Sequence, residues 1–208
     1  MIFLGPLYSF LAKHLATNIN HFALVKLVII SLDKTIFYFL LFAFLRLLWL
    51  LLIRRRRSHL SESLVWVFTF YVMFLLAVTT FRESYFPWQL TFDWNRPLSD
   101  INLIFFKETW KLTKGTTLFD FVYNAFGNIL CFIPFGFLFP NLIKKKKCIL
   151  QTVFAGMVLS LFIETMQFGL NTGVSDIDDV FFNTIGAIFG YLVYIFIKKV
   201  RVVLVKSF

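Results

Sequence analysis

Five long apolar stretches, each about as long as a membrane-spanning helix, constrain this chain more than any other feature. They occupy residues 36–53, 64–81, 121–143, 149–170 and 180–197. A helix needs about 17–25 mostly apolar residues to cross a bilayer, and backbone groups in lipid must bond within the chain, which favours helices. Of all residues 59% are hydrophobic and 15% charged, whereas a soluble domain has about 25% charged residues. The sequence therefore predicts an all-α fold, a polytopic membrane helical bundle of about five transmembrane helices.

Basic residues set the expected orientation of these spans. The runs 54–57 and 144–147 follow the first and third spans, and further basic residues close the chain. Cytoplasmic loops of membrane proteins carry an excess of Lys and Arg. We therefore expect the N-terminus outside and the C-terminus in the cytoplasm of a multi-pass protein. The net charge of +10 needs no nucleic acid as a partner, because no basic face with interleaved aromatics lies outside the spans.

The expected spans divide the chain into five segments. Residues 36–81 would form a first transmembrane hairpin, and residues 121–199 a three-helix core. Between them, residues 82–120 would be an extracytoplasmic, aromatic-rich segment, either a layer at the membrane interface or a lid over a site. We expect residues 1–35 to be an interfacial amphipathic segment, with one extra crossing as the alternative. Residues 200–208 would be a basic cytoplasmic tail.

Polar side chains inside the last three spans are the candidate functional residues, because ionisable groups are costly in a membrane. Glu164 shares one helical face with Gln167, Gly156 and Ser160. In the third and fifth spans, polar residues also recur at helical spacing on one face, near the end of each span that is expected to lie outside. We expect these faces to point into the bundle. We predict a polar, acidic pocket open to the extracytoplasmic side. Its candidate residues are Asn124, Asn128, Glu164, Gln167, Asp176, Asp178, Asp179 and Asn183.

Some of these residues have a structural alternative. Asp178 or Asp179 could cap the last helix, and the asparagines could join helices by hydrogen bonds. Small residues at helical spacing let helices approach closely, and a proline bends a helix. The residues that we assign to a helix kink and close packing are Pro134, Gly136, Gly156, Gly186 and Gly190.

Other kinds of site have little support in the sequence. The three histidines lie outside the polar set, so a histidine-based catalytic or zinc site is not expected. The aspartates of 176–179 could ligate Ca²⁺ or Mg²⁺, but we expect no resident metal and no cofactor. Arg46 lies in the middle of the first span and needs a partner, for which Glu164 is one candidate.

Three ordered blocks resemble the signatures of the VanZ-like family. They are Asn-Ala-Phe-Gly-Asn at 124–128 with Pro134-Phe-Gly136, Glu-Thr-Met-Gln at 164–167, and Asp-Ile-Asp-Asp at 176–179 with Asn183, Gly186 and Gly190. Asn102-Leu-Ile resembles a short element before the first block, and the resemblance covers about residues 102–197. It implies a bacterial plasma-membrane protein related to one that lowers susceptibility to the glycopeptide antibiotic teicoplanin. Many members have an Arg before the acidic block, where this chain has Gly173 or its neighbours.

Two classes of function are open. In the first, the protein is a non-enzymatic envelope factor whose pocket binds a membrane lipid, a lipid-linked cell-wall precursor or an envelope protein. In the second, it is a membrane enzyme that uses Glu164 and Asp176 or Asp179 as acid and base on a lipid-linked envelope substrate. The sequence shows no nucleophile with a positioned base, which favours the first class.

Overall fold

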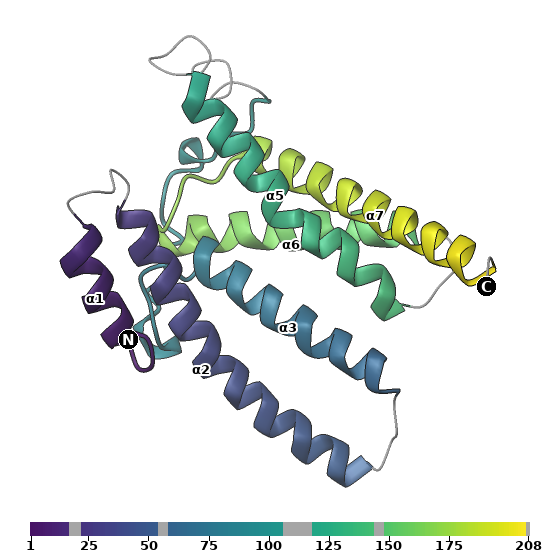
Figure 1. The fold of residues 1–208 in the computed structure, drawn as a ribbon. Coiled ribbons are helices and arrows are strands. Elements are labelled where there is room, and N and C mark those ends of the chain that lie inside the picture. The colour runs from purple at the N-terminus through teal and green to yellow at the C-terminus, as the bar shows by residue number, and fades with distance from the viewer. Residues whose placement is uncertain (17–21, 54–57, 106–117, 144–147, 207–208) are drawn as a thin grey trace. The chain divides into compact units, whose positions relative to one another are not determined.

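The computed structural model of the 208-residue chain describes all residues except 17–21, 54–57, 106–117, 144–147 and 207–208, and leaves out the side chains of 98, 118–124 and 205–206. The described part contains two 3₁₀ turns and six α-helices (Figure 1). The α-helices are α1 (Gly5–Leu15), α2 (Phe22–Ile53), α3 (His59–Thr79), α5 (Leu118–Ile143), α6 (Ile149–Leu170) and α7 (Ile177–Lys206). The 3₁₀ turns are Pro87–Gln89 and Leu98–Asp100.

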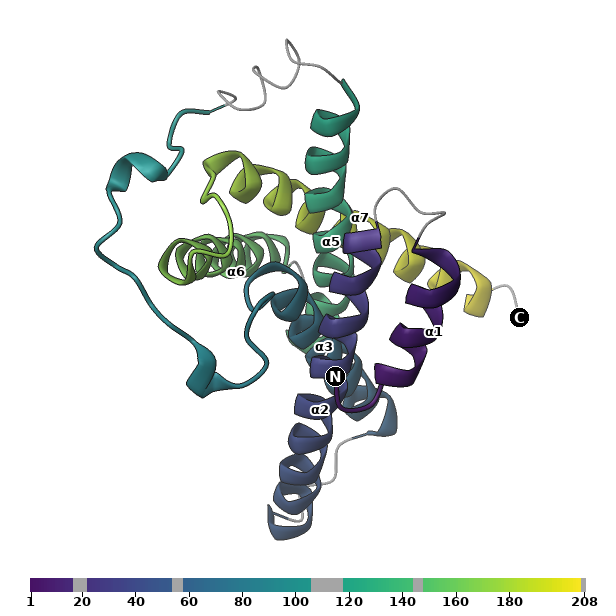
Figure 2. The same cartoon turned by 90° about the vertical axis from the view of Figure 1, so that its left-hand side faces the viewer.

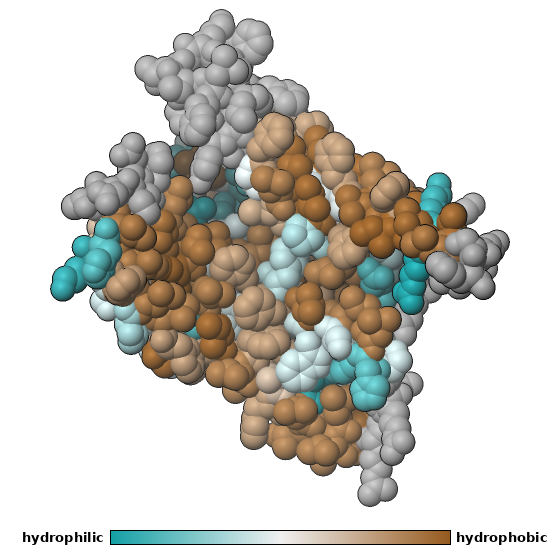
Figure 3. Space-filling view, in the orientation of Figure 1, coloured by the Kyte–Doolittle hydropathy of each residue, from teal (hydrophilic) through white to brown (hydrophobic). Residues whose placement is uncertain are grey.

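Two compact units divide the chain, Met1–Leu90 with α1 to α3 and Thr91–Phe208 with α5 to α7. Within the described residues, five helices are long and apolar enough to cross a membrane, namely α2, α3, α5, α6 and α7. Apolar residues cover most of the surface seen in Figure 3, as expected for helices in contact with lipid. The predicted all-helical polytopic membrane fold is confirmed.

Helix α2 is longer than the expected first span, because it begins at Phe22. Its 32 residues extend for about 48 Å at 1.5 Å per residue, more than the ~30 Å hydrocarbon core of a bilayer. The segment 1–35 is therefore split between α1 and the first turns of α2, which lie side by side (Figures 1 and 2). The ring centroids of Tyr8 and Phe22 are 6.2 Å apart at this contact. Helix α7 likewise continues to Lys206, through most of the expected tail.

Glycines bring α5 and α7 into backbone contact. A Cβ added at Gly136 would overlap the backbone of Ala187, and a Cβ at Gly186 or Gly190 would overlap backbone atoms of α5. Side chains at these three positions would push the helices apart. Small residues therefore allow the close packing of α5 against α7.

The third helix of this unit, α6, meets the other two through another small residue. A Cβ at Gly156 would lie 2.9 Å from the Ala187 Cβ atom and 3.5 Å from the ring of Phe135.

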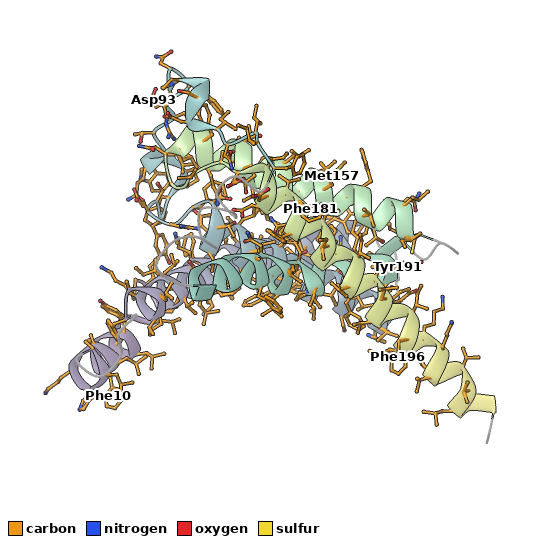
Figure 4. The ribbon with its side chains drawn as sticks, turned by 90° about the horizontal axis from the view of Figure 1, so that it is seen from above. Phe10, Asp93, Met157, Phe181, Tyr191 and Phe196 are labelled. Carbon is orange, nitrogen blue, oxygen red and sulfur yellow. The ribbon has the colours of Figure 1, made fainter. Side chains whose placement is uncertain are left out.

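Pro134 lies inside α5, which changes direction near its middle in Figure 1. Along α7, Tyr191 is buried, whereas Phe181 and Phe196 are exposed (Figure 4). The buried side of each helix therefore faces the other two helices.

Candidate functional site

Glu164 lies at the centre of a set of polar contacts in the second unit. Its side chain is only 5% exposed, although it belongs to the apolar helix α6. Its carboxylate accepts a hydrogen bond of 2.9 Å from the backbone N–H of Asp176, and the Ser175 side chain also hydrogen-bonds to it. Glu164 therefore faces the start of α7 and is shielded from lipid.

The turn between α6 and α7 brings these groups together. Asn171 ends α6 with a φ of 53°, a left-handed conformation that asparagine adopts more readily than most residues. The Asp176 carboxylate accepts a hydrogen bond of 2.9 Å from the N–H of Asp178, and so caps the start of α7. The capping role that we considered for Asp178 or Asp179 thus belongs to Asp176.

Two further bonds join the helices around Glu164. The Asn128 side-chain amide of α5 donates to the carboxylate of Asp179 at 2.6 Å. The Asn183 amide of α7 donates to the Ser160 hydroxyl of α6 at 2.8 Å. Asn183 is 4% exposed, and its carboxamide oxygen has no hydrogen-bond partner among the described atoms. A buried acceptor without a donor is rare, and it leaves a place for a donor from outside the chain.

We call these residues the polar cluster. Its members are Asn128, Ser160, Glu164, Ser175, Asp176, Asp179 and Asn183. Of the other predicted pocket residues, Asp178 and Gln167 are buried beside it, 3% and 6% exposed. Asn124 lies in α5, but its side chain is outside the described part.

Two residues in these contacts, Asn102 and Ser175, were not among the predicted pocket residues. Asn102 pairs with the chain at 175–177 through backbone bonds, and its amide donates to the Asp176 carboxylate at 3.0 Å. Ser175 lies in a turn, where helical periodicity carries no information. The resemblance of Asn102-Leu-Ile to a family element was the one available signal for Asn102.

The segment before Asn102 covers the end of α6. The N–H of Asp93 donates to the carbonyl of Gly169 at 2.8 Å, and the Trp94 ring lies where a Gly169 Cβ would be. The Arg96 guanidinium donates to the carbonyl of Phe168 at 3.1 Å and lies over its ring. A cation at the C-terminal end of a helix is favourable because the last carbonyls carry partial negative charge. This part of 82–120 belongs to the second unit, and residues up to Leu90 belong to the first.

Charge in the polar cluster is mainly of one sign. Asp176 and Asp179 are close enough for their charges to act on Glu164. Arg46 is not their counter-ion, because its Nε and Nη2 atoms bind Glu62 at 2.7 and 2.9 Å within the first unit. Among the described residues, no group of three or more His, Cys, Asp or Glu residues could hold a metal ion. The polar cluster is therefore rich in acceptors, suited to hydroxyl, amide or ammonium donors.

Comparison with known proteins identifies the family. The VanZ/LLP1 family model matches residues 68–198, from within α3 to α7. Protein VanZ of Enterococcus faecium is 39% identical over 67 residues, which cover 32% of this chain and 41% of that relative. No solved structure matches the chain. Because the family model matches more than half of its length, the chain belongs to the VanZ/LLP1 family.

Proposed function

We propose that this protein is a non-enzymatic factor of the bacterial cell envelope. In this proposal the polar cluster binds the head group of a lipid or a lipid-linked cell-wall precursor, and this binding changes susceptibility to glycopeptides such as teicoplanin. Family membership and the likeness to Protein VanZ support the envelope role. The glycopeptide effect comes from the family resemblance. In an alternative form of this proposal, the polar cluster binds an envelope protein in place of a lipid. The lipid analysis described below distinguishes these two possibilities.

The observation that carries the proposal is the buried carboxylate of Glu164. Its described partners, the Ser175 side chain and the N–H of Asp176, are both donors that a neutral glutamine oxygen could also satisfy. If Glu164 only joined α6 to the start of α7, a neutral side chain could therefore replace it. An ionisable group inside a membrane is costly and most often functional.

The acceptors of the polar cluster indicate the chemical class of the ligand. Glu164, Asp176 and Asp179 are carboxylates, and the Asn183 oxygen is an open acceptor. Sugar hydroxyls, peptide amides and amines supply donors, whereas a bare phosphate would meet charges of its own sign. A lipid-linked wall precursor carries such donors on its sugar and peptide part. Glu164 lies six residues before the end of α6, about 9 Å along the helix, which is a depth that a head group can reach.

A susceptibility assay tests this function. In cells that depend on this protein for their teicoplanin response, we expect Glu164→Gln and Asp179→Asn to accumulate in the membrane normally and to lose the response. Asp93→Asn is the matched control, because Asp93 lies outside the polar cluster and Asn95 N–H can still bond to an asparagine oxygen. The response is normalised to the amount of protein in the membrane. A full response in both cluster variants would refute a charge-dependent role.

Lipid analysis of the purified protein tests the ligand itself. We expect a lipid-linked precursor to copurify with the wild type and with Asp93→Asn, and to be reduced at least tenfold with Glu164→Gln. Copurification of an envelope protein in place of a lipid, lost in the same variant, would point to the protein-partner alternative. Equal lipid content in all three samples would contradict binding by the polar cluster.

One observation favours an enzyme as the second candidate function. The Ser175 side chain hydrogen-bonds to Glu164, which places a hydroxyl next to a carboxylate base. In this reading Glu164 accepts the Ser175 proton as the Ser175 oxygen bonds to an acyl carbon of a lipid-linked substrate and the ester bond to the leaving alcohol breaks. Asp176 or Asp179, as the second carboxyl group, gives the leaving alcohol its proton, and water then hydrolyses the acyl-serine. Incubation of the purified protein with a lipid-linked precursor, followed by mass spectrometry, distinguishes the two functions. More product than protein, lost in Ser175→Ala, would establish turnover, and binding without product would exclude it.

A further inference from the structure

A second candidate site lies in the first unit and shares no residue with the polar cluster. An apolar, partly open cavity of about 270 Å³ lies between α2, α3 and the strap that follows α3, residues 81–90. Its walls include Met73, Leu76, Phe86 and Leu90. A second, more open hollow of about 450 Å³ includes Tyr8 and the charged side chain of Glu83 in its lining. Lys34 and Tyr85 line both, so the two spaces meet at these side chains.

The strap is fixed in place by bonds to α2. The Lys34 ammonium donates to the backbone carbonyls of Phe81, Arg82 and Ser84. The Tyr38 hydroxyl donates to the carbonyl of Tyr85 at 2.9 Å. The cavity is therefore formed before any ligand arrives, as is usual for small-molecule sites.

Lys34 has no salt bridge in the described part of the chain. Its side chain is 3% exposed, and its bonds all go to neutral carbonyls. The neighbouring carboxylate of Asp33 is turned to other donors, the N–H groups of residues 2–4 and the Tyr85 hydroxyl. Burial raises the pKa of Tyr85, so its hydroxyl remains a donor at neutral pH. An anion beside Lys34 would compensate its charge.

The second hollow also contains a side chain of the opposite charge to Lys34. Glu83 lines it and is exposed. A head group with both a phosphate and an amine would complement Lys34 and Glu83 together. The strap follows directly on the end of the apolar helix α3, and its Phe86 and Trp88 rings are stacked 4.6 Å apart with Trp88 exposed. Exposed tryptophan at the end of a span is typical of the head-group layer.

We propose that the first unit binds a phospholipid with an amine-bearing head group. One acyl chain fills the apolar cavity, the phosphate lies beside Lys34, and the amine lies beside Glu83. A lipid from the surrounding bilayer suits this site better than a soluble ligand, because the apolar wall belongs to two membrane-spanning helices. The site is independent of the polar cluster and of its ligand.

Native mass spectrometry of the whole protein, with phosphatidylethanolamine or phosphatidylglycerol added, tests the proposal. We expect the wild type to retain one phosphatidylethanolamine after other lipids are removed. Leu76→Trp fills the cavity and should lose it, whereas Val67→Trp, on the exposed side of the same helix, should keep it. Equal retention by the wild type and Leu76→Trp would overturn the proposal.

Glu83→Gln tests the head group without disturbing the fold, because Glu83 is exposed. We expect this variant to lose about two- to fivefold in preference for phosphatidylethanolamine over phosphatidylglycerol, the size of an exposed ion pair. An unchanged preference would overturn the head-group assignment. Thermal unfolding in detergent shows whether Leu76→Trp is folded. If it is not, the comparison of wild type with Glu83→Gln decides the proposal.

Discussion

Replacing Gly190 with alanine should force α7 away from α5. A Cβ at this position would overlap the carbonyl oxygen of Ile133 and lie 2.8 Å from the backbone nitrogen of Phe137. Both are backbone atoms, so no side-chain rotation can relieve the overlap. Overpacking of this kind costs about 1–3 kcal/mol, whereas alanine favours a helix over glycine by about 0.5–1 kcal/mol. We expect a net loss of about 1–2 kcal/mol in the free energy of unfolding.

Gly127→Ala provides the matched control. Gly127 lies in α5, and a Cβ there would meet nothing within 4 Å. The same substitution should therefore be neutral or raise the free energy of unfolding by about 0.5–1 kcal/mol. Thermal unfolding in one detergent measures both variants. For a chain of this size, 1–2 kcal/mol corresponds to a fall of about 2–8 °C in Tm for Gly190→Ala.

Gly136→Ala probes the same contact from the other helix. The Gly136 Cα atom is 2.9 Å from the position of a Gly190 Cβ, so one separation of the helices would relieve both overlaps. The double variant should therefore lose less stability than the two single losses added together. If Gly190→Ala were as stable as Gly127→Ala, α5 and α7 could not be in backbone contact, and the reasoning would be wrong.

Three further predictions concern charge and topology. Arg46→Met and Glu62→Gln should each lower the free energy of unfolding by up to about 3–5 kcal/mol, and the double variant should lose less than either; simple additivity would show that the pair is not coupled. Asp176→Ala should cost about 1 kcal/mol through the lost cap of α7, and Asp176→Asn much less; equal losses in thermal unfolding would contradict the capping role. With both native cysteines replaced, a cysteine at Ser99 should react with a reagent added outside the cell, and a cysteine at Ser58 should not. The reverse result would show that the orientation of the spans is opposite to the predicted one.

The ends of the spans are predictable where polar residues interrupt the apolar pattern. Helix α6 covers residues 149–170, as expected, because a lysine run precedes it and Asn171 terminates it. For α2, the expected span begins at residue 36, after the charged pair Asp33 and Lys34, whereas the helix begins at Phe22. Their hydrogen-bond partners are distant in the sequence: the N–H groups of residues 2–4 for Asp33, and carbonyls of the strap for Lys34. The sequence pattern around Asp33 and Lys34 does not identify these distant partners.

The partner of Arg46 was within reach of the sequence. In an antiparallel helical hairpin, residues at equal distances from the turn lie opposite each other. Arg46 and Glu62 are equally distant from residue 54, and so are Ser31 and Ala77, which are joined by a hydrogen bond of 3.1 Å. Helical periodicity compares positions within one helix, so it does not identify Glu62 on the neighbouring helix as the partner of Arg46. Glu164 was therefore considered as a candidate. The polar cluster differs, because its stripes lie on separate helices that each point inward.

The two units treat charge in opposite ways, and this contrast locates the function that we propose. In the first unit the charge of Arg46 is offset by Glu62, and the carboxylate of Asp33 accepts bonds from four donors. A charge that only supports a membrane fold is costly unless such partners offset it. In the second unit the buried Glu164 instead experiences two carboxylates of its own sign, next to an amide oxygen that lacks a donor. This arrangement raises the free energy of the protein alone, and a ligand rich in hydrogen-bond donors would lower it. We therefore expect the proposed envelope function to require the carboxylates of the polar cluster.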